Sequence, residues 1–269
     1  AYLYGPADKR EAILSELEGL RAIPDDPISL VEACFAREHE GQPKGVVFDD
    51  HFQLPPLRER YPEELLSFLV PDGYDGDKPT GLMILLHGGG MGTGRDRARL
   101  WLEKEPEGGG GYHFREELAE RSYISVAPSN LLLPTHQRWS NPESDAYLLA
   151  VIEEAACRYN IDPDRVYVMG QSMGGFGAFH VVQTLGDRFA TVGSHAGAWY
   201  YGFWEGLRNV DFCIMQGAND NVPGERPRFT DLPFARMASA ILSGFHIPHT
   251  YIEHDGGHSF TNPEARKAG

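Results

Sequence analysis

The sequence contains few cysteines, and this shortage excludes several kinds of site. Only three occur in 269 residues, odd in number and widely spaced. Neither a disulfide framework nor a Cys-x-x-Cys metal pattern can be formed from them. Cys157 and Cys213 lie among apolar residues and are interpreted as small buried hydrophobic side chains.

Positive charge is also scarce: 24 Lys and Arg stand against 39 Asp and Glu, a formal net charge of −15. Nucleic acids and anionic membranes bind to basic faces, so neither is an expected partner. No apolar run approaches the length of a membrane span. The chain begins Ala-Tyr-Leu-Tyr, without an initiator methionine or a signal-peptide pattern. We therefore expect a soluble protein, either cytoplasmic or secreted with its leader removed. The oligomeric state stays open.

Hydrophobic residues are plentiful, at 41% of the chain with 11% aromatic, which is enough for a large core. Strand-like apolar runs occur at 46–54 and 65–71. From residue 81 such runs alternate with helical patterns, notably at 142–160 and 230–244. This alternation is typical of a mostly parallel sheet with helices on both faces. The predicted class is α/β, with a ligand site at the carboxyl ends of the strands.

One glycine-rich segment has the features of a nucleophile turn. Gly170-Gln171-Ser172-Met173-Gly174 follows the strand-like run "RVYVM" and begins a helical pattern. This is G-x-S-x-G in its strand–turn–helix context. The turn holds the serine at an unfavourable backbone angle, and glycines two residues away on each side avoid the steric conflict. A flexible glycine loop is the alternative, but the flanking strand and helix favour Ser172 as a nucleophile.

A second glycine segment, His87-Gly88-Gly89-Gly90, ends the run "GLMILL". A segment of this kind supplies a backbone N–H to an oxyanion hole, together with the residue after the nucleophile. The predicted donors are therefore Gly89 and Met173, with Gly88 and Gly90 as alternatives to Gly89. A plain glycine turn is the competing interpretation.

A nucleophilic serine requires a base, and the base requires an acid that orients it. In this architecture the chain order is serine, acid, histidine. Asp220 follows the run "DFCIMQG" at its carboxyl end, whereas Asp211 opens that run at the wrong edge of the sheet. Asp231 begins the next helical pattern and is interpreted as an N-cap residue. Asp220 is the predicted acid.

The segment "HTYIEHDGGHSF" offers His249, His254 and His258 as the base. His258 follows a Gly-Gly turn that allows its ring to reach the strand ends, so it is the predicted base, with His254 as the fallback. His246 adds a fourth histidine, but no H-E-x-x-H or cysteine pairing accompanies the group. Pro248 also breaks helical spacing, and no metal site is expected.

Aromatic residues cluster at 198–206, "AWYYGFWEG", just past a strand end. We expect this segment to line the substrate mouth, because core packing does not account for all of its aromatic side chains. Aromatic walls favour aryl or extended apolar acyl groups. The predicted substrate-binding residues are Trp139, His195, Trp199, Tyr200 and Trp204.

With these residues in place, the chain resembles the α/β-hydrolase esterases. It is most similar to feruloyl and acetyl-xylan esterases (carbohydrate esterase family one) and to polyhydroxybutyrate-depolymerase-like proteins. The matching phrases lie between about residues 45 and 260: "LLSFLVPDGYDGDKPTGLMILLHGGG", "RWSNPESDAYLLAVIEEAACRYNIDPDRVYVMGQSMGGFGAF", "DFCIMQGANDNVP" and "DGGHSF".

The resemblance implies hydrolysis of carboxylic esters by Ser172, Asp220 and His258, without metal or organic cofactor. The implied substrates are aryl or feruloyl, acetyl or polyester-type esters, on a small molecule or a polymer. One alternative is a serine peptidase of the prolyl-oligopeptidase type, although the chain has no room for that family's propeller. Another is a hydrolase fold used only for binding, but such a protein loses a triad member and this sequence retains all three.

Two parts of the chain depart from the family pattern. Residues 1–40 are predicted to form an N-terminal helical extension, a cap, packing arm or oligomer contact, before an α/β-hydrolase catalytic domain at 41–269. An apolar stripe at helical spacing supports its first helix: Ile13, Leu14, Leu17 and Leu20. The chain stops eleven residues past His258, so the usual last helix is expected to be short or truncated.

Overall fold

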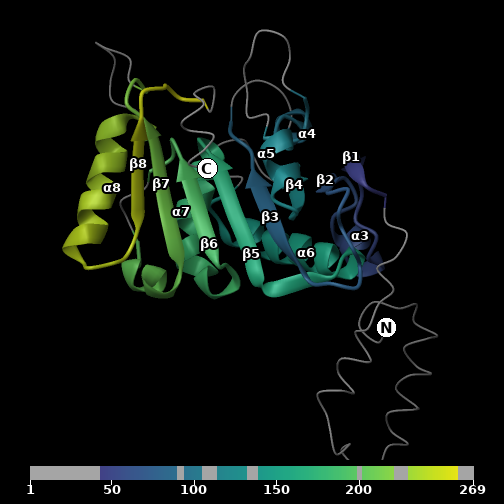
Figure 1. Cartoon of the computed structure of the whole chain (residues 1–269). Helices are drawn as coiled ribbons and strands as arrows, with labels where there is room; N and C mark the ends of the chain where they lie inside the picture. The colour runs from purple at the N-terminus through teal and green to yellow at the C-terminus, as the bar shows by residue number, and fades with distance from the viewer. Residues whose placement is uncertain are drawn as a thin grey trace, which may run out of the picture.

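An eight-stranded sheet organises the protein, with the strand order β1-β2-β4-β3-β5-β6-β7-β8. The computed structural model describes residues 43–89, 94–104, 114–131, 139–198, 202–220 and 230–259. Figure 1 shows the strands side by side, with β8 and α8 at one end of the sheet and β1 at the other. The β1–β2 and β2–β4 pairs are antiparallel and all the others are parallel. The predicted mostly parallel α/β sheet is therefore confirmed.

The elements follow in chain order as β1 (Gly45–Asp50), α3 (Pro55–Arg60), β2 (Leu66–Val70), β3 (Thr80–Leu86), α4 (Gly94–Arg99), α5 (Arg115–Glu120), β4 (Ile124–Pro128), α6 (Pro142–Arg158), β5 (Ile161–Gln171), α7 (Met173–Thr184), η1 (Gly186–Arg188), β6 (Thr191–His195), η2 (Trp204–Asn209), β7 (Asp211–Gly217), α8 (Leu232–Gly244) and β8 (Thr250–His254).

Helices cover both faces of the sheet. Successive side chains of a buried strand point to opposite faces, so each strand contributes side chains to both layers. Ile84 of β3 belongs to the larger apolar cluster, which includes residues of α6, α7 and α8. Its neighbour Leu85 belongs to a second cluster, which includes Leu118 of α5 and Trp101, just after α4. A continuous apolar strand sequence therefore fills two cores at once.

The long predicted helices are close to their observed bounds. The pattern at 142–160 corresponds to α6, which begins with a proline at its first position and is capped by Asn141, whose side chain accepts the Ser144 N–H at 2.9 Å. The pattern at 230–244 corresponds to α8, with Asp231 at its N-cap. The strand predicted at 46–54 stops at Asp50, because the chain turns there into α3, which Pro55 begins.

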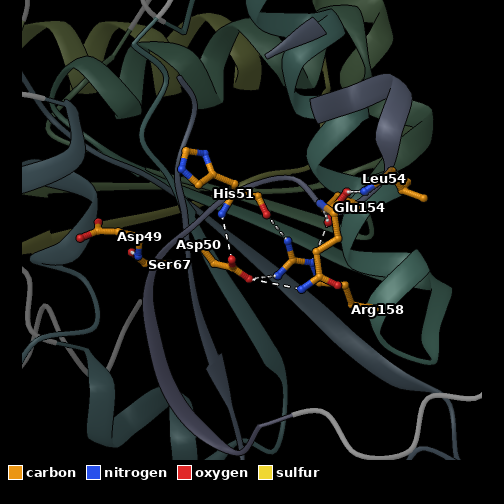
Figure 2. A network of polar contacts seen from close by, with 8 residues as sticks. Asp49, Asp50, His51, Leu54, Ser67, Glu154 and Arg158 are labelled. Atoms are coloured by element: carbon orange, nitrogen blue, oxygen red, sulfur yellow. Dashed lines mark hydrogen bonds and ion pairs between the residues drawn. The ribbon is translucent and has the colours of Figure 1, made fainter. Parts of the chain in front are cut away.

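A buried ionic network joins α6 to the connection between β1 and α3 (Figure 2). Glu154 is fully buried and accepts the backbone N–H groups of Gln53 and Leu54, at 2.6 and 3.1 Å. Arg158 donates to Glu154 at 2.7 Å and to Asp50 at 2.5 Å. Charges of both signs and backbone donors thus compensate the desolvation of the Glu154 carboxylate. The network anchors the helix that leads into β5.

The predicted helical extension at residues 1–40 lies outside the described residues. The same holds for residues 260–269, where a short last helix was expected. The boundary between the extension and the α/β unit stays a prediction. In the part of the chain that the structure describes, no helix combines the length and apolar character needed to cross a bilayer.

Candidate active site

Ser172 occupies a strained turn between β5 and α7. Its φ of 55° and ψ of −115° lie in a region that residues with a side chain rarely adopt. The Ser172 N–H donates to the His195 carbonyl oxygen of β6 at 2.9 Å, which ties the turn to the neighbouring strand. A Cβ added at Gly170 would lie 1.9 Å from the Gly174 oxygen, so glycine is required there for the turn to close. The strain is therefore imposed by the surrounding strand and helix.

Three side chains from separate elements meet at the carboxyl end of the sheet. The Nε2 atom of His258 lies 2.9 Å from Ser172 Oγ, and its Nδ1 atom lies 2.7 Å from Asp220 Oδ2. Asp220 follows β7 and is 3% exposed, whereas the His258 side chain is 43% exposed. The Asp220 carboxylate is thus shielded from water while the His258 imidazole is exposed to solvent. This arrangement allows a proton to pass from Ser172 Oγ to His258, with the carboxylate behind the ring.

Asp211 and Asp231, the other two carboxylates considered for this role, lie where the sequence analysis predicted. Asp211 is exposed at the first position of β7, at the opposite end of that strand from Asp220. Asp231 forms the N-cap of α8. Of the three acids, Asp220 is the one within hydrogen-bonding distance of His258.

The loop that carries His258 is hydrogen-bonded to the loop that carries Asp220 and to β5, the strand before Ser172. The Ala218 N–H donates to the His254 carbonyl at 2.8 Å, and the Asn219 N–H donates to the Gly256 carbonyl at 3.0 Å. The Gln171 side-chain amide donates to the His258 carbonyl at 2.6 Å. His258 is therefore positioned by residues directly beside Ser172 and Asp220.

Gly89 and Met173, the predicted oxyanion donors, lie next to each other. A Cβ built on Gly89 would be 3.8 Å from Met173 Cβ. Met173 is the first residue of α7, so its N–H has no acceptor within the helix. The strand end beneath is held by Trp139, whose indole N–H donates to the His87 carbonyl at 3.0 Å. Gly90, one of the alternatives, lies outside the described residues.

The chain shares sequence with known esterases. The model of the Esterase family matches residues 140–222, which include Ser172 and Asp220. Feruloyl esterase C of Emericella nidulans is 25% identical over 70% of this chain and 74% of its own length. The bifunctional acetylxylan esterase/xylanase XynS20E of Neocallimastix patriciarum is 32% identical over 27% of this chain. The chain spans about a tenth of the length of that second relative, 11%.

Solved structures are similar over most of the chain. The CE1 ferulic acid esterase AmCE1/Fae1A of Anaeromyces mucronatus superposes with a TM-score of 0.58 at 17% identity, over 87% of this chain and 91% of that one. The chain has the α/β-hydrolase fold. The predicted fold is confirmed, and so is the predicted resemblance to carboxylic ester hydrolases of the feruloyl and acetyl-xylan esterase group.

Three of the five predicted substrate-binding residues of this α/β-hydrolase are buried. Trp139 and His195 have no exposed surface, and Trp204 is 7% exposed within η2. Trp139 and Trp204 belong to the larger apolar cluster, so both pack in the core. Trp199 and Tyr200 lie outside the described residues. Within the aromatic segment 198–206, Phe203 is 82% exposed whereas Trp204 is buried. Aromatic composition alone therefore does not predict which of these side chains is exposed, because exposure depends on tertiary packing.

Two glutamines were missed by sequence reasoning. Gln171 binds the His258 carbonyl, and Gln216 of β7 donates its amide to Asp220 Oδ2 at 3.1 Å and to the Thr230 carbonyl at 2.9 Å. The only available signal was their place: Gln171 precedes the nucleophile, and Gln216 lies four residues before the acid. His254, the fallback base, is 3% exposed, and its Nε2 atom lies 3.0 Å from His195 Nε2. Among the described residues, no group of three or more His, Cys, Asp or Glu side chains could hold a metal ion.

Proposed function

We propose that this α/β-hydrolase is a serine hydrolase that cleaves carboxylic esters through Ser172, His258 and Asp220. The observation that carries the proposal is the continuous chain from Ser172 Oγ to His258 Nε2, at 2.9 Å, and from His258 Nδ1 to Asp220 Oδ2, at 2.7 Å. An ionised Asp220 accepts the Nδ1–H of a neutral imidazole, which leaves the Nε2 lone pair directed at the serine hydroxyl. That is the state required of a general base.

In the first half of the reaction, His258 takes the proton of Ser172 Oγ as the oxygen attacks the ester carbonyl carbon. The backbone N–H groups of Met173 and Gly89 stabilise the negative charge on the carbonyl oxygen. His258 then gives its proton to the leaving alcohol, and the acyl group stays on Ser172. In the second half, water attacks this acyl-enzyme with His258 again as base, and the free acid leaves. Asp220 stabilises the imidazolium throughout without accepting its proton.

The relatives support a proposal for the substrate class. A feruloyl esterase and an acetylxylan esterase share sequence with the chain, and a ferulic acid esterase shares its fold. We therefore propose aryl or feruloyl, acetyl or polyester-type esters as substrates, on a small molecule or a polymer. The proposal gives catalytic roles to the triad and the two oxyanion donors, and it names no residue that recognises the acyl group.

A fluorophosphonate probe tests the nucleophile. Labelling is expected on the wild-type protein and absent from Ser172→Ala, with the modified residue located by mass spectrometry of the peptide that contains the elbow. Modification of another residue, or no modification, would contradict the assignment. The no-label result is the one expected of a hydrolase fold used only for binding.

A substrate panel tests the reaction class. Values of kcat/KM are compared for feruloyl, acetyl, aryl and polyester substrates and for a proline-containing peptide amide, with Ser172→Ala as the blank. Esters are expected to react and the amide is not. A peptide amide cleaved faster than every ester would favour the serine peptidase of the prolyl-oligopeptidase type.

A further inference from the structure

Two buried histidines form a pair directly behind the base loop, although the proposed reaction uses neither. His195 ends β6 and His254 ends β8, and they are 0% and 3% exposed. Their Nε2 atoms lie 3.0 Å apart, which is the distance of an N–H···N hydrogen bond. The ring planes are within 12° of each other. Burying two imidazoles in contact is costly unless each ring nitrogen is matched to a partner of the right kind.

The contacts of His254 determine where its proton lies. The Gly256 N–H donates to His254 Nδ1 at 3.0 Å, so that nitrogen must present a lone pair. A neutral His254 therefore carries its proton on Nε2 and donates it to His195 Nε2. His195 is the acceptor in this bond, and its own proton lies on Nδ1. One tautomer of His254 therefore satisfies both of its contacts, and the bond between the two rings then fixes the tautomer of His195.

The backbone of Gly256 connects this pair to the segment that carries the base, His258. Its N–H is held by the His254 ring and its carbonyl by the Asn219 N–H, which donates at 3.0 Å. Gly256 and Gly257 precede His258 directly. Glycine imposes little restriction on its own backbone, so this turn depends on such contacts to hold one conformation. The pair therefore acts at the point where the chain departs towards His258.

We propose that His195 and His254 are positioning residues for the base: their hydrogen bond keeps His254 in the Nε2–H tautomer, so that its Nδ1 holds the Gly256 amide and the turn that delivers His258. This inference rests on the proposed function, because it assumes that His258 is the base. His195 acts through His254, because its Nε2 atom bonds to the His254 ring at 3.0 Å.

The environment keeps His195 neutral while the base changes its charge. Burial, followed by repulsion from His254 and His258, holds the pKa of His195 well below the ordinary histidine value. When His258 becomes an imidazolium in the reaction, a second cation beside it is therefore disfavoured. The Nδ1 lone pair of His254 therefore stays available to the Gly256 N–H throughout the reaction.

Four variants test the proposal by steady-state kinetics on an aryl ester. His254→Leu removes the acceptor for the Gly256 amide. His195→Leu leaves His254 in place but takes away the acceptor that selects its tautomer. His254→Asn puts an amide oxygen near the position of Nδ1. His249→Leu is the matched control, because His249 is half-buried just before β8 and bonds to Ser239 and Ile247 rather than to the turn.

We expect kcat to fall about 10- to 100-fold in both leucine variants of the pair while KM changes by less than about twofold, since a misplacement of about 1 Å can cost that much. His254→Asn should recover most of the loss seen in His254→Leu, and the control should stay within about twofold of wild type. Circular dichroism and melting curves establish that each variant is folded. A merely structural role predicts a lower melting temperature with kcat retained, and that result would overturn the proposal.

Two further measurements complete the test. Long-range ¹H–¹⁵N NMR spectra of the wild-type histidine rings should show an Nε2–H tautomer for one buried ring and Nδ1–H for its partner, assigned with the two leucine variants. An Nδ1–H tautomer for His254 overturns the proposal without any functional assay. Labelling of wild-type Ser172 by a fluorophosphonate separates the two levels: an unlabelled wild type overturns the proposed function and this inference together. A labelled, active wild type with unimpaired pair variants overturns only the inference.

Discussion

The substitution Asp220→Asn tests the charge behind the base, and the structure predicts how the new amide is oriented. Asp220 Oδ2 accepts from two donors, His258 Nδ1 at 2.7 Å and Gln216 Nε2 at 3.1 Å. Gln216 is 1% exposed and its amide also donates to the Thr230 carbonyl, so it is not free to reverse. An asparagine is therefore expected to place its oxygen, not its NH₂ group, at this position. The tautomer of His258 is kept and only the negative charge is lost.

The size of the effect follows from that orientation. A carboxylate and an imidazolium with centres about 4 Å apart attract each other by about 4 kcal/mol at an effective permittivity of about 20. Because the His258 side chain is 43% exposed, screening by water reduces this contribution to about 3 kcal/mol. The expected fall in kcat is therefore about 10²-fold. An amide with its NH₂ group towards His258 would select the wrong tautomer and cost about 10⁴-fold.

The assay is kcat and kcat/KM on an aryl ester, with Asp211→Asn and Asp231→Asn as matched controls that also remove one carboxylate. Both controls are expected to stay within about twofold of wild type, because Asp211 is exposed at the far end of β7 and asparagine is as good an N-cap residue as the buried Asp231. A loss below tenfold in Asp220→Asn would show that the charge is not used. A loss near 10⁴-fold would refute the orientation argued from Gln216. A larger loss in Asp211→Asn would remove Asp220 from the acid position.

Three more expectations concern single side chains of the site. Ser172→Ala should reduce kcat by about 10⁴-fold or more, and adding His258→Ala should cost little further because triad members act as a unit; multiplied losses in the double variant would contradict a shared proton path. Gln171→Met keeps the length of the side chain but removes its bond to the His258 carbonyl. The value of kcat should fall about tenfold with KM nearly unchanged. A rise in KM with kcat unchanged would instead indicate a binding role. Because the pKa of His195 is lowered in the folded protein, unfolding takes up a proton and stability falls as the pH drops below about 6.5. The melting temperature of His195→Leu should then depend less on pH between 7 and 5 than that of wild type, and parallel curves would show that His195 does not contribute.

Sequence reasoning was most successful where the chemistry is local. The strand, the glycine-flanked serine and the following helix are contiguous, so the turn at Ser172 could be expected from the residues at 165–179. The α/β class followed from the alternation of apolar runs and helical patterns, which reports element type because each element has its own period. The choice of Asp220 and His258 as partners of the serine used chain order, the place of Asp220 after a strand and the Gly-Gly turn before His258, and the structure brings both within hydrogen-bonding distance of the intended atoms.

Tertiary structure alone decided which side chains meet and which ones water can reach. His195 and His254 lie 59 residues apart and come together because β6 and β8 flank β7 in the sheet. Trp139 looked like a wall of the substrate mouth, yet it is fully buried beneath the strand end that it holds. Hydrophobic periodicity describes one segment at a time, whereas burial and long-range contacts depend on the spatial order of the strands in the sheet. The sequence by itself therefore determined the class of fold and the local turn of the nucleophile. The packing of separate strand ends against one another decided which side chains lie beside Ser172 and His258.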